Sequence, residues 1–100
     1  MLDSTIIKIN TINKLQAIHG LKNKKFSRDI ERLGERLAAI AANVYLESYY
    51  KHTKYGSVAE ARALFRQGFD AYGLPQRLAG KVQAACLEVL KDWGLLTLLQ

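Results

Sequence analysis

The chain is poor in residues that cross-link or interrupt a protein chain. Its 100 residues include one cysteine, Cys86, and one proline, Pro75. A single cysteine excludes an internal disulfide framework. With 49% hydrophobic residues and so little proline, the chain is too apolar and too regular to be disordered. The length suits one domain, so we expect a single globular domain over residues 1–100.

Long apolar runs and targeting signals are also missing. The longest nearly apolar stretch, residues 37–46, contains Asn43 and is half as long as the ~20 residues that a bilayer span needs. The first residues carry Asp3 and Lys8 among isoleucines and show no cleavage site of a secretory signal. These absences predict a cytoplasmic protein that has no membrane partner.

Acidic residues are few, and they are dispersed. Nine stand against fifteen basic residues, which gives a net charge of +6. A nuclease needs clustered carboxylates to hold metal, and His19 and His52 have no cysteine or carboxylate at metal-ligand spacing. No glycines form a phosphate-binding loop, and Cys86 lies on an apolar helix face as an inert core thiol. We therefore predict no catalytic residue, no metal and no cofactor, and no enzymatic activity.

The clearest helix is predicted over residues 27–50. Ser27 is a good N-cap, and an apolar seam follows at alternating steps of three and four residues. Gly34 costs about 1 kcal/mol relative to alanine inside a helix, so we expect another helix to approach it closely. The seam consists of Ile30, Leu33, Leu37, Ile40 and Val44.

Two more helices are predicted in the second half. Ser57 and Glu60 form a capping box that begins a helix ending at Tyr72. Gly73 stops that helix, and Pro75 begins the next at its first position. The last helix is expected to run to Trp93, stop at Gly94 and bury Leu78, Val82, Ala85, Cys86, Val89, Leu90 and Trp93. The residues 95–99 are expected to fold back on the core, with contact to a partner as the alternative.

The segment Ser4–Ile18 is ambiguous. Apolar residues at every third position suggest a helix, whereas the β-branched residues 5–9 favour an extended strand. Gly20 ends the segment in either case. The apolar residues are Ile6, Ile9, Ile12, Leu15 and Ile18. Together the segments predict an all-α fold, a compact bundle of four to five helices.

Basic residues recur four positions apart on the expected helices, which places each set on one side of its helix. Stacked like charges repel, so these rows gain most when a polyanion lies across them. Acidic neighbours are expected to offset part of the charge: Asp29 for Arg32, Glu31 for Arg28 and Asp70 for Arg66. A solvated, partly neutralised helix face is the alternative for any single row. The rows are Arg28, Arg32 and Arg36; Arg62 and Arg66; Arg77 and Lys81.

Two basic linkers contain aromatic residues, Phe26 in residues 20–26 and three tyrosines in residues 49–55. Interleaved rings and cations suit single-stranded nucleic acid, whose bases stack while its phosphates pair with the cations. We predict a non-catalytic, largely sequence-nonspecific subunit that binds single-stranded RNA or DNA. The predicted contacts are Lys22, Lys24, Lys25, Arg28, Arg32, Arg36, Tyr50, Lys51, Lys54, Tyr55, Arg62, Arg66, Arg77 and Lys81.

In its size, its helical content and its basic rows, the chain resembles the small helical subunit of multi-subunit (Class 1) CRISPR interference complexes. The resemblance implies a role in antiviral defence, in which short basic bundles stack along the complex and support the target or displaced strand. It also implies other protein subunits as partners, including copies of the same chain. Residues 95–99 and the small-residue face of the helix over residues 27–50 then become candidate subunit contacts.

Two other functions remain as alternatives. The first is a small helix-turn-helix regulator, in which Gln76, Arg77 and Lys81 reach base edges from the start of the last helix. Its broad apolar face is instead typical of a core helix. The second is a protein-interaction or inhibitor module whose basic face contacts an acidic protein.

Overall fold

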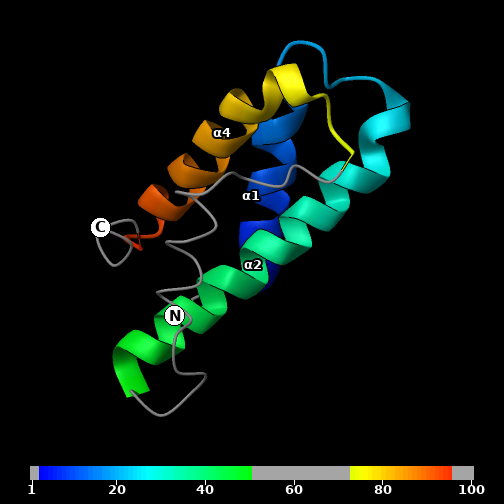
Figure 1. The fold of residues 1–100 in the computed structure, drawn as a ribbon. Helices are drawn as coiled ribbons and strands as arrows, with labels where there is room; N and C mark the ends of the chain where they lie inside the picture. The colour runs from blue at the N-terminus through cyan, green and yellow to red at the C-terminus, as the bar shows by residue number, and fades with distance from the viewer. Residues whose placement is uncertain (1–2, 51–72, 96–100) are drawn as a thin grey trace.

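The computed structural model describes residues 3–50 and 73–95, and this part of the chain is helical, as predicted. It contains the helices α1 (Ser4–Gln16), α2 (Ser27–Tyr50) and α4 (Ala79–Asp92), as Figure 1 shows. Short 3-10 turns, η1 (Lys24–Phe26) and η2 (Gln76–Leu78), lead into α2 and α4. The predicted helix over residues 57–72 and its capping box lie outside the described residues. A bundle of four to five helices therefore stays a prediction.

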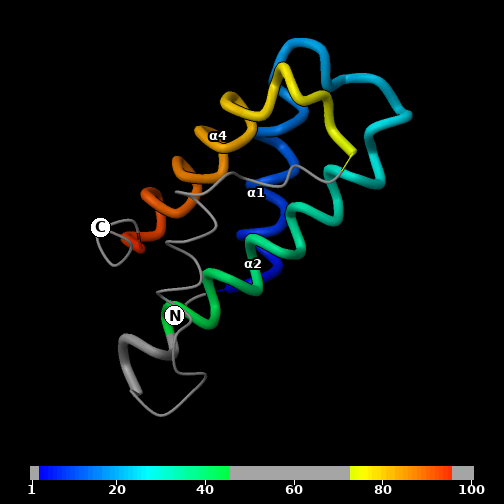
Figure 2. Tube along the Cα trace, viewed as in Figure 1, coloured from blue at the N-terminus to red at the C-terminus, as the bar shows by residue number. Residues whose placement is uncertain are grey.

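Of the three described helices, α2 and α4 run in the same direction and α1 runs in the opposite one (Figures 1 and 2). α1 is antiparallel to both α2 and α4, so that α1 ends where the other two begin (Figures 1 and 2). α1 packs against each of them. The radius of gyration, 13.1 Å, equals the value of about 13 Å expected for a compact domain of this length.

α1 begins at a side-chain cap that the sequence reading missed. The Asp3 carboxylate accepts hydrogen bonds from the backbone amides of Thr5 at 3.0 Å and Ile6 at 3.3 Å. Such a cap satisfies amides that a helix start otherwise leaves without partners. Despite its β-branched residues, this segment is therefore helical.

The buried face of α1 follows only part of the apolar series in its sequence. Ile7, Thr11 and Leu15, spaced four residues apart, are fully buried, whereas Ile6 and Ile9 are 45% and 50% exposed. A three-residue step drifts around a helix of 3.6 residues per turn, so the early members of that series turn away from the core. The hydroxyl of Thr11 donates to the carbonyl of Ile7 at 2.7 Å, which lets it enter the core with its hydrogen bond made.

α2 covers the predicted residues 27–50, and its seam is buried except for the half-buried Ile40. The close approach predicted at Gly34 is confirmed. A Cβ atom there would lie 3.1 Å from Cγ1 of Ile12 and 3.2 Å from the carbonyl oxygen of Lys8. The backbones of α1 and α2 are therefore too close for a larger side chain.

Both predicted helix starts need correction. Ser27 is already helical, with φ −56° and ψ −42°, because η1 precedes it. The cap is Asn23, whose Oδ1 accepts from the amide of Lys25 at 3.0 Å. Pro75 likewise precedes η2 in an extended conformation, and α4 begins only at Ala79. Before α2 the 3-10 turn occupies the end of the linker, and before α4 it occupies the residues expected to form the first α-helical turn.

The end of α4 is a Schellman motif, as the predicted stop at Gly94 requires. Gly94 has φ +71°, and its amide donates to the carbonyl of Lys91 at 3.0 Å. The amide of Leu95 donates to the carbonyl of Leu90 at 2.9 Å. Leu95 is buried. The predicted fold-back is thus confirmed for Leu95, and residues 96–99 lie outside the described part.

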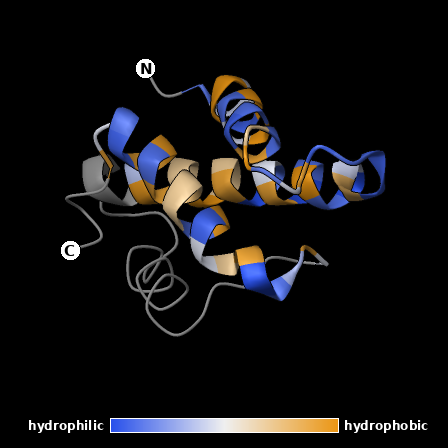
Figure 3. Ribbon diagram, turned by 90° about the horizontal axis from the view of Figure 1, so that it is seen from above, coloured by the Kyte–Doolittle hydropathy of each residue, from blue (hydrophilic) through white to orange (hydrophobic). Residues whose placement is uncertain are grey.

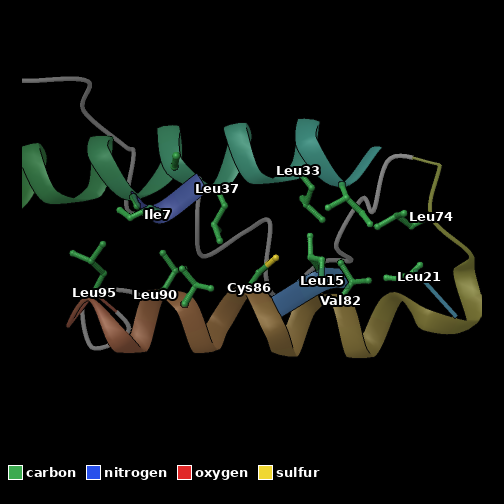
Figure 4. Close-up of a cluster of buried hydrophobic side chains, with 14 of the residues drawn as sticks. Ile7, Leu15, Leu21, Leu33, Leu37, Leu74, Val82, Cys86, Leu90 and Leu95 are labelled. Carbon is green, nitrogen blue, oxygen red and sulfur yellow. The ribbon is translucent and has the colours of Figure 1, made fainter. Parts of the chain in front are cut away.

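One core joins the three helices. Each helix has an apolar and a polar side (Figure 3), and Leu33 and Leu37 of α2 face the apolar side chains of α4, among them Cys86 and Leu90 (Figure 4). Ala85 and Trp93, predicted as buried, are half-buried against this core. None of the helices in residues 3–50 and 73–95 has both the length and the hydropathy that a membrane span requires.

Replacing Gly34 should test the contact between α1 and α2. We expect Gly34→Val to lower the free energy of unfolding by about 1–3 kcal/mol, because its side chain would force the two backbones apart. Gly80→Ala is the matched control, since a Cβ at Gly80 meets nothing within 4 Å. It should stabilise the protein by up to about 1 kcal/mol. Urea denaturation measures both effects, and a neutral Gly34→Val would contradict the close approach.

The buried thiol predicts a loss of stability in alkaline solution. Burial raises the pKa of Cys86 from 9.0 to about 12. Between these values the unfolded state binds fewer protons than the native state, so the free energy of unfolding falls as the pH rises, by at most about 1.4 kcal/mol per pH unit. Denaturation of Cys86→Ala across the same pH range should show a shallower fall. Equal slopes would mean that the native thiol titrates normally.

Candidate nucleic-acid interface

Two separate segments bring basic residues to one end of the bundle. The linker between α1 and α2 lies beside η2 and the start of α4 (Figure 1). At Gly20, a Cβ atom would lie 3.3 Å from Cδ1 of Leu78 and 3.6 Å from Nη2 of Arg77. Lys81 lines a groove together with Ala17 and Ile18. We call this surface the basic end; it consists of Lys22, Lys24, Lys25, Arg28, Arg77 and Lys81.

Within the part of the chain that the structure describes, no carboxylate pairs with the cations of the basic end. All six side chains are exposed, and within the described residues none of them lies within 4.0 Å of a carboxylate. Asp29 is the one acidic residue in residues 17–29 and 73–81. Its Oδ2 would lie 3.0 Å from a Cβ at Gly73, so the carboxylate packs on the backbone there. The basic end therefore presents a concentrated positive potential to solvent.

The basic row of α2 extends from this end. Arg32 and Arg36 are exposed and follow Arg28 at four-residue steps. The expected pairings of Asp29 with Arg32 and of Glu31 with Arg28 do not form among the described residues. The row is thus less neutralised than the sequence suggested.

Four carboxylates of α2 and α4 pair with lysines of α1. Lys8 Nζ lies 3.5 Å from Glu31 and 3.1 Å from Glu35, and the hydrogen bond to Glu35 raises the pKa of Lys8. On the other side of α1, Lys14 Nζ lies 3.3 Å and 3.8 Å from carboxylate oxygens of α4. Those oxygens belong to Glu88 and Asp92. Both acidic pairs therefore bind α1, and the cations of the basic end have no carboxylate partner in residues 3–50 and 73–95.

The structure does not place every predicted contact. Tyr50 ends α2, but its side chain lies outside the described part, as do Lys51, Lys54, Tyr55, Arg62 and Arg66. Phe26 is half-buried against the core, and Lys25 Nζ lies 5.0 Å from its ring centroid. The ring of Phe26 therefore packs at the edge of the core and has Lys25 above it in a cation–π contact. This arrangement leaves little of the ring for base stacking.

A pocket at the basic end was missed by the sequence reading. It has a volume of about 360 Å³ and is lined by Gln16, Leu21, Lys22, Asn23, Ser27 and Ile30. No spacing in the sequence points to it, because its walls come from the end of α1, the linker and the start of α2. Only the turn of the linker brings these residues together.

No group of three or more histidine, cysteine or acidic side chains is arranged to hold a metal within residues 3–50 and 73–95. Gln76, Arg77 and Lys81 are exposed near the start of α4, while the opposite face of that helix is buried. Comparisons were made with protein-family models, with curated proteins and with solved structures. None of them matches the chain. We therefore infer the function from the arrangement of charge and from the pocket.

Two substitutions should separate the paired from the unpaired cations. Arg32→Gln removes repulsion with its neighbours at positions 28 and 36, so we expect it to raise the free energy of unfolding by about 0.2–0.5 kcal/mol. Lys8→Gln should lower it, because two carboxylates lose their partner. Thermal melts at low and high salt measure both effects, which salt should diminish. Destabilisation by Arg32→Gln would show that this arginine has a stabilising contact.

Proposed function

We propose that this protein is a non-catalytic subunit that binds nucleic acid through the sugar–phosphate backbone. The observation that carries the proposal is the basic end, where six exposed cations from two segments meet without a carboxylate partner among the described residues. Such a surface favours a polyanion, because phosphates replace the repulsion between cations with attraction and release their counterions.

The direction of the helices adds to this potential. η1 and α2, like η2 and α4, have their N-terminal ends at the basic end (Figure 1). The partial positive charge of a helix N-terminus attracts anions. Arg32 and Arg36 offer a track of further phosphate contacts along α2. Contacts of this kind fix the position of a nucleic acid without reading its sequence.

We further propose that the ligand is single-stranded RNA or DNA and that the protein works beside other subunits. Small helical subunits of CRISPR interference complexes, which the chain resembles in size and charge, provide one such setting. In that setting the basic end would support a strand. The side chain of Leu95 is buried in the core, so among residues 95–99 only those after Leu95 would be candidates for subunit contacts.

The proposal is tested by neutralising one cation from each segment of the basic end. We expect Lys22→Gln combined with Arg77→Gln to weaken binding of a single-stranded homopolymer. The slope of log Kd against log salt concentration should fall by about 1.4, since each lost phosphate contact removes about 0.7. Fluorescence anisotropy at several salt concentrations measures both quantities.

Lys91→Gln is the control, because Lys91 is exposed at the other end of α4 and has no carboxylate within 4.0 Å among the described residues. It should leave the affinity and the salt slope unchanged. An unaltered slope in the double variant would refute the basic end as the contact surface. Tight binding to discrete duplex sites would favour a helix-turn-helix regulator, and no binding near physiological salt would favour a protein-interaction module.

A further inference from the structure

The pocket at the basic end differs in chemistry from the cations around it. Leu21 and Ile30 border the pocket, but both are about 1% exposed and offer a ligand little surface. Gln16, Asn23 and Ser27 supply amide and hydroxyl groups, and Lys22 stands at the same pocket. Its volume of about 360 Å³ is within the range of small-molecule pockets, about 300–1,000 Å³. Amide and hydroxyl groups therefore make up much of the surface that a ligand would meet.

The polar groups of the pocket retain hydrogen-bonding capacity. Ser27 follows η1 in a helical conformation and caps nothing, and within the described residues neither its hydroxyl nor the Gln16 amide has a hydrogen-bond partner. Asn23 uses Oδ1 to accept from the amide of Lys25, which leaves its NH₂ group to donate. Donors and acceptors are therefore both available to a ligand.

We propose that this pocket receives one unpaired base of the nucleic acid, while Lys22 and Arg28 hold its phosphates. The inference rests on the proposed function and extends it from backbone binding to base contact. A base has a polar edge of donors and acceptors that the amide and hydroxyl groups of Gln16, Asn23 and Ser27 can match. A base inside a duplex is stacked and paired, so it cannot enter a pocket of this kind.

The amides of the pocket match the edge of adenine. A glutamine or asparagine side chain can donate and accept at once, and this pattern pairs bidentately with adenine. The Gln16 amide is the group with both functions unused. We therefore expect adenine to bind more tightly than a strand that lacks bases, on both RNA and DNA backbones.

The test combines Gln16→Ala with Ser27→Ala and keeps Asn23, because Asn23 caps η1. The probes are single-stranded adenine oligomers, as RNA and as DNA, and an abasic oligomer of the same length. We expect the double variant to bind the adenine oligomers about tenfold more weakly. Affinity for the abasic oligomer and the salt slope should not change, because every cation remains in place.

Asn13→Ala combined with Ser4→Ala is the matched control. It removes an exposed amide and an exposed hydroxyl of α1 that do not line the pocket, and it should bind every probe as the unmodified protein does. Thermal melts show whether each variant is folded.

The pocket proposal is overturned if the unmodified protein binds adenine and abasic oligomers equally well. It is also overturned if the Gln16 and Ser27 variant keeps its full affinity for adenine. Either result leaves the basic end intact as a backbone-binding surface. Failure of the proposed function gives a different result, an unaltered salt slope after Lys22 and Arg77 are neutralised.

Discussion

The packing of α1 against both other helices determines the rest of the arrangement. At Gly34 the backbones of α1 and α2 approach so closely that a Cβ would lie 3.2 Å from a carbonyl oxygen. On the opposite side, Lys14 bridges α1 to α4. Because α1 is antiparallel to both neighbours, the starts of α2 and α4 are held at the same end of the bundle (Figure 1). This arrangement gathers the six cations of the basic end on one surface, although Lys22 and Lys81 are 59 positions apart in the sequence.

The same helix also separates the charges. Its two lysines bind four of the carboxylates of α2 and α4 along its flanks. Within the described residues these acids pair with α1 and not with the arginines. A modest net charge of +6 becomes a local excess by this pairing, since among the described residues the cations of the basic end have no carboxylate within 4.0 Å. Attraction of a polyanion depends on this local excess more than on the total charge.

The sequence predicted features that depend on local periodicity. The seam of α2 and the stop at Gly94 were correct because 3.6-residue spacing and a glycine after an apolar run act within one element. The buried face of α1 depends on neighbours and could not be predicted: Ile6 has the same apolar character as Ile7, and only the position of α2 and α4 decides which is buried. Ser27 was mistaken for a cap because a 3-10 turn before it shifts the true cap to Asn23. The pocket was unpredictable for a similar reason, as its lining residues meet only after the linker has turned.

Each lysine of α1 is paired with two acids that are four residues apart on a neighbouring helix, Glu31 with Glu35 and Glu88 with Asp92. The pairing is therefore redundant. Loss of one acid leaves the other in place to hold the same ammonium group. The orientation of α1 therefore tolerates the replacement of any one of these four acidic residues by a neutral one. The sequence can thus drift at each of them in turn while the bundle keeps its geometry. Only the simultaneous loss of both members of a pair, or of the lysine that they share, removes the bridge.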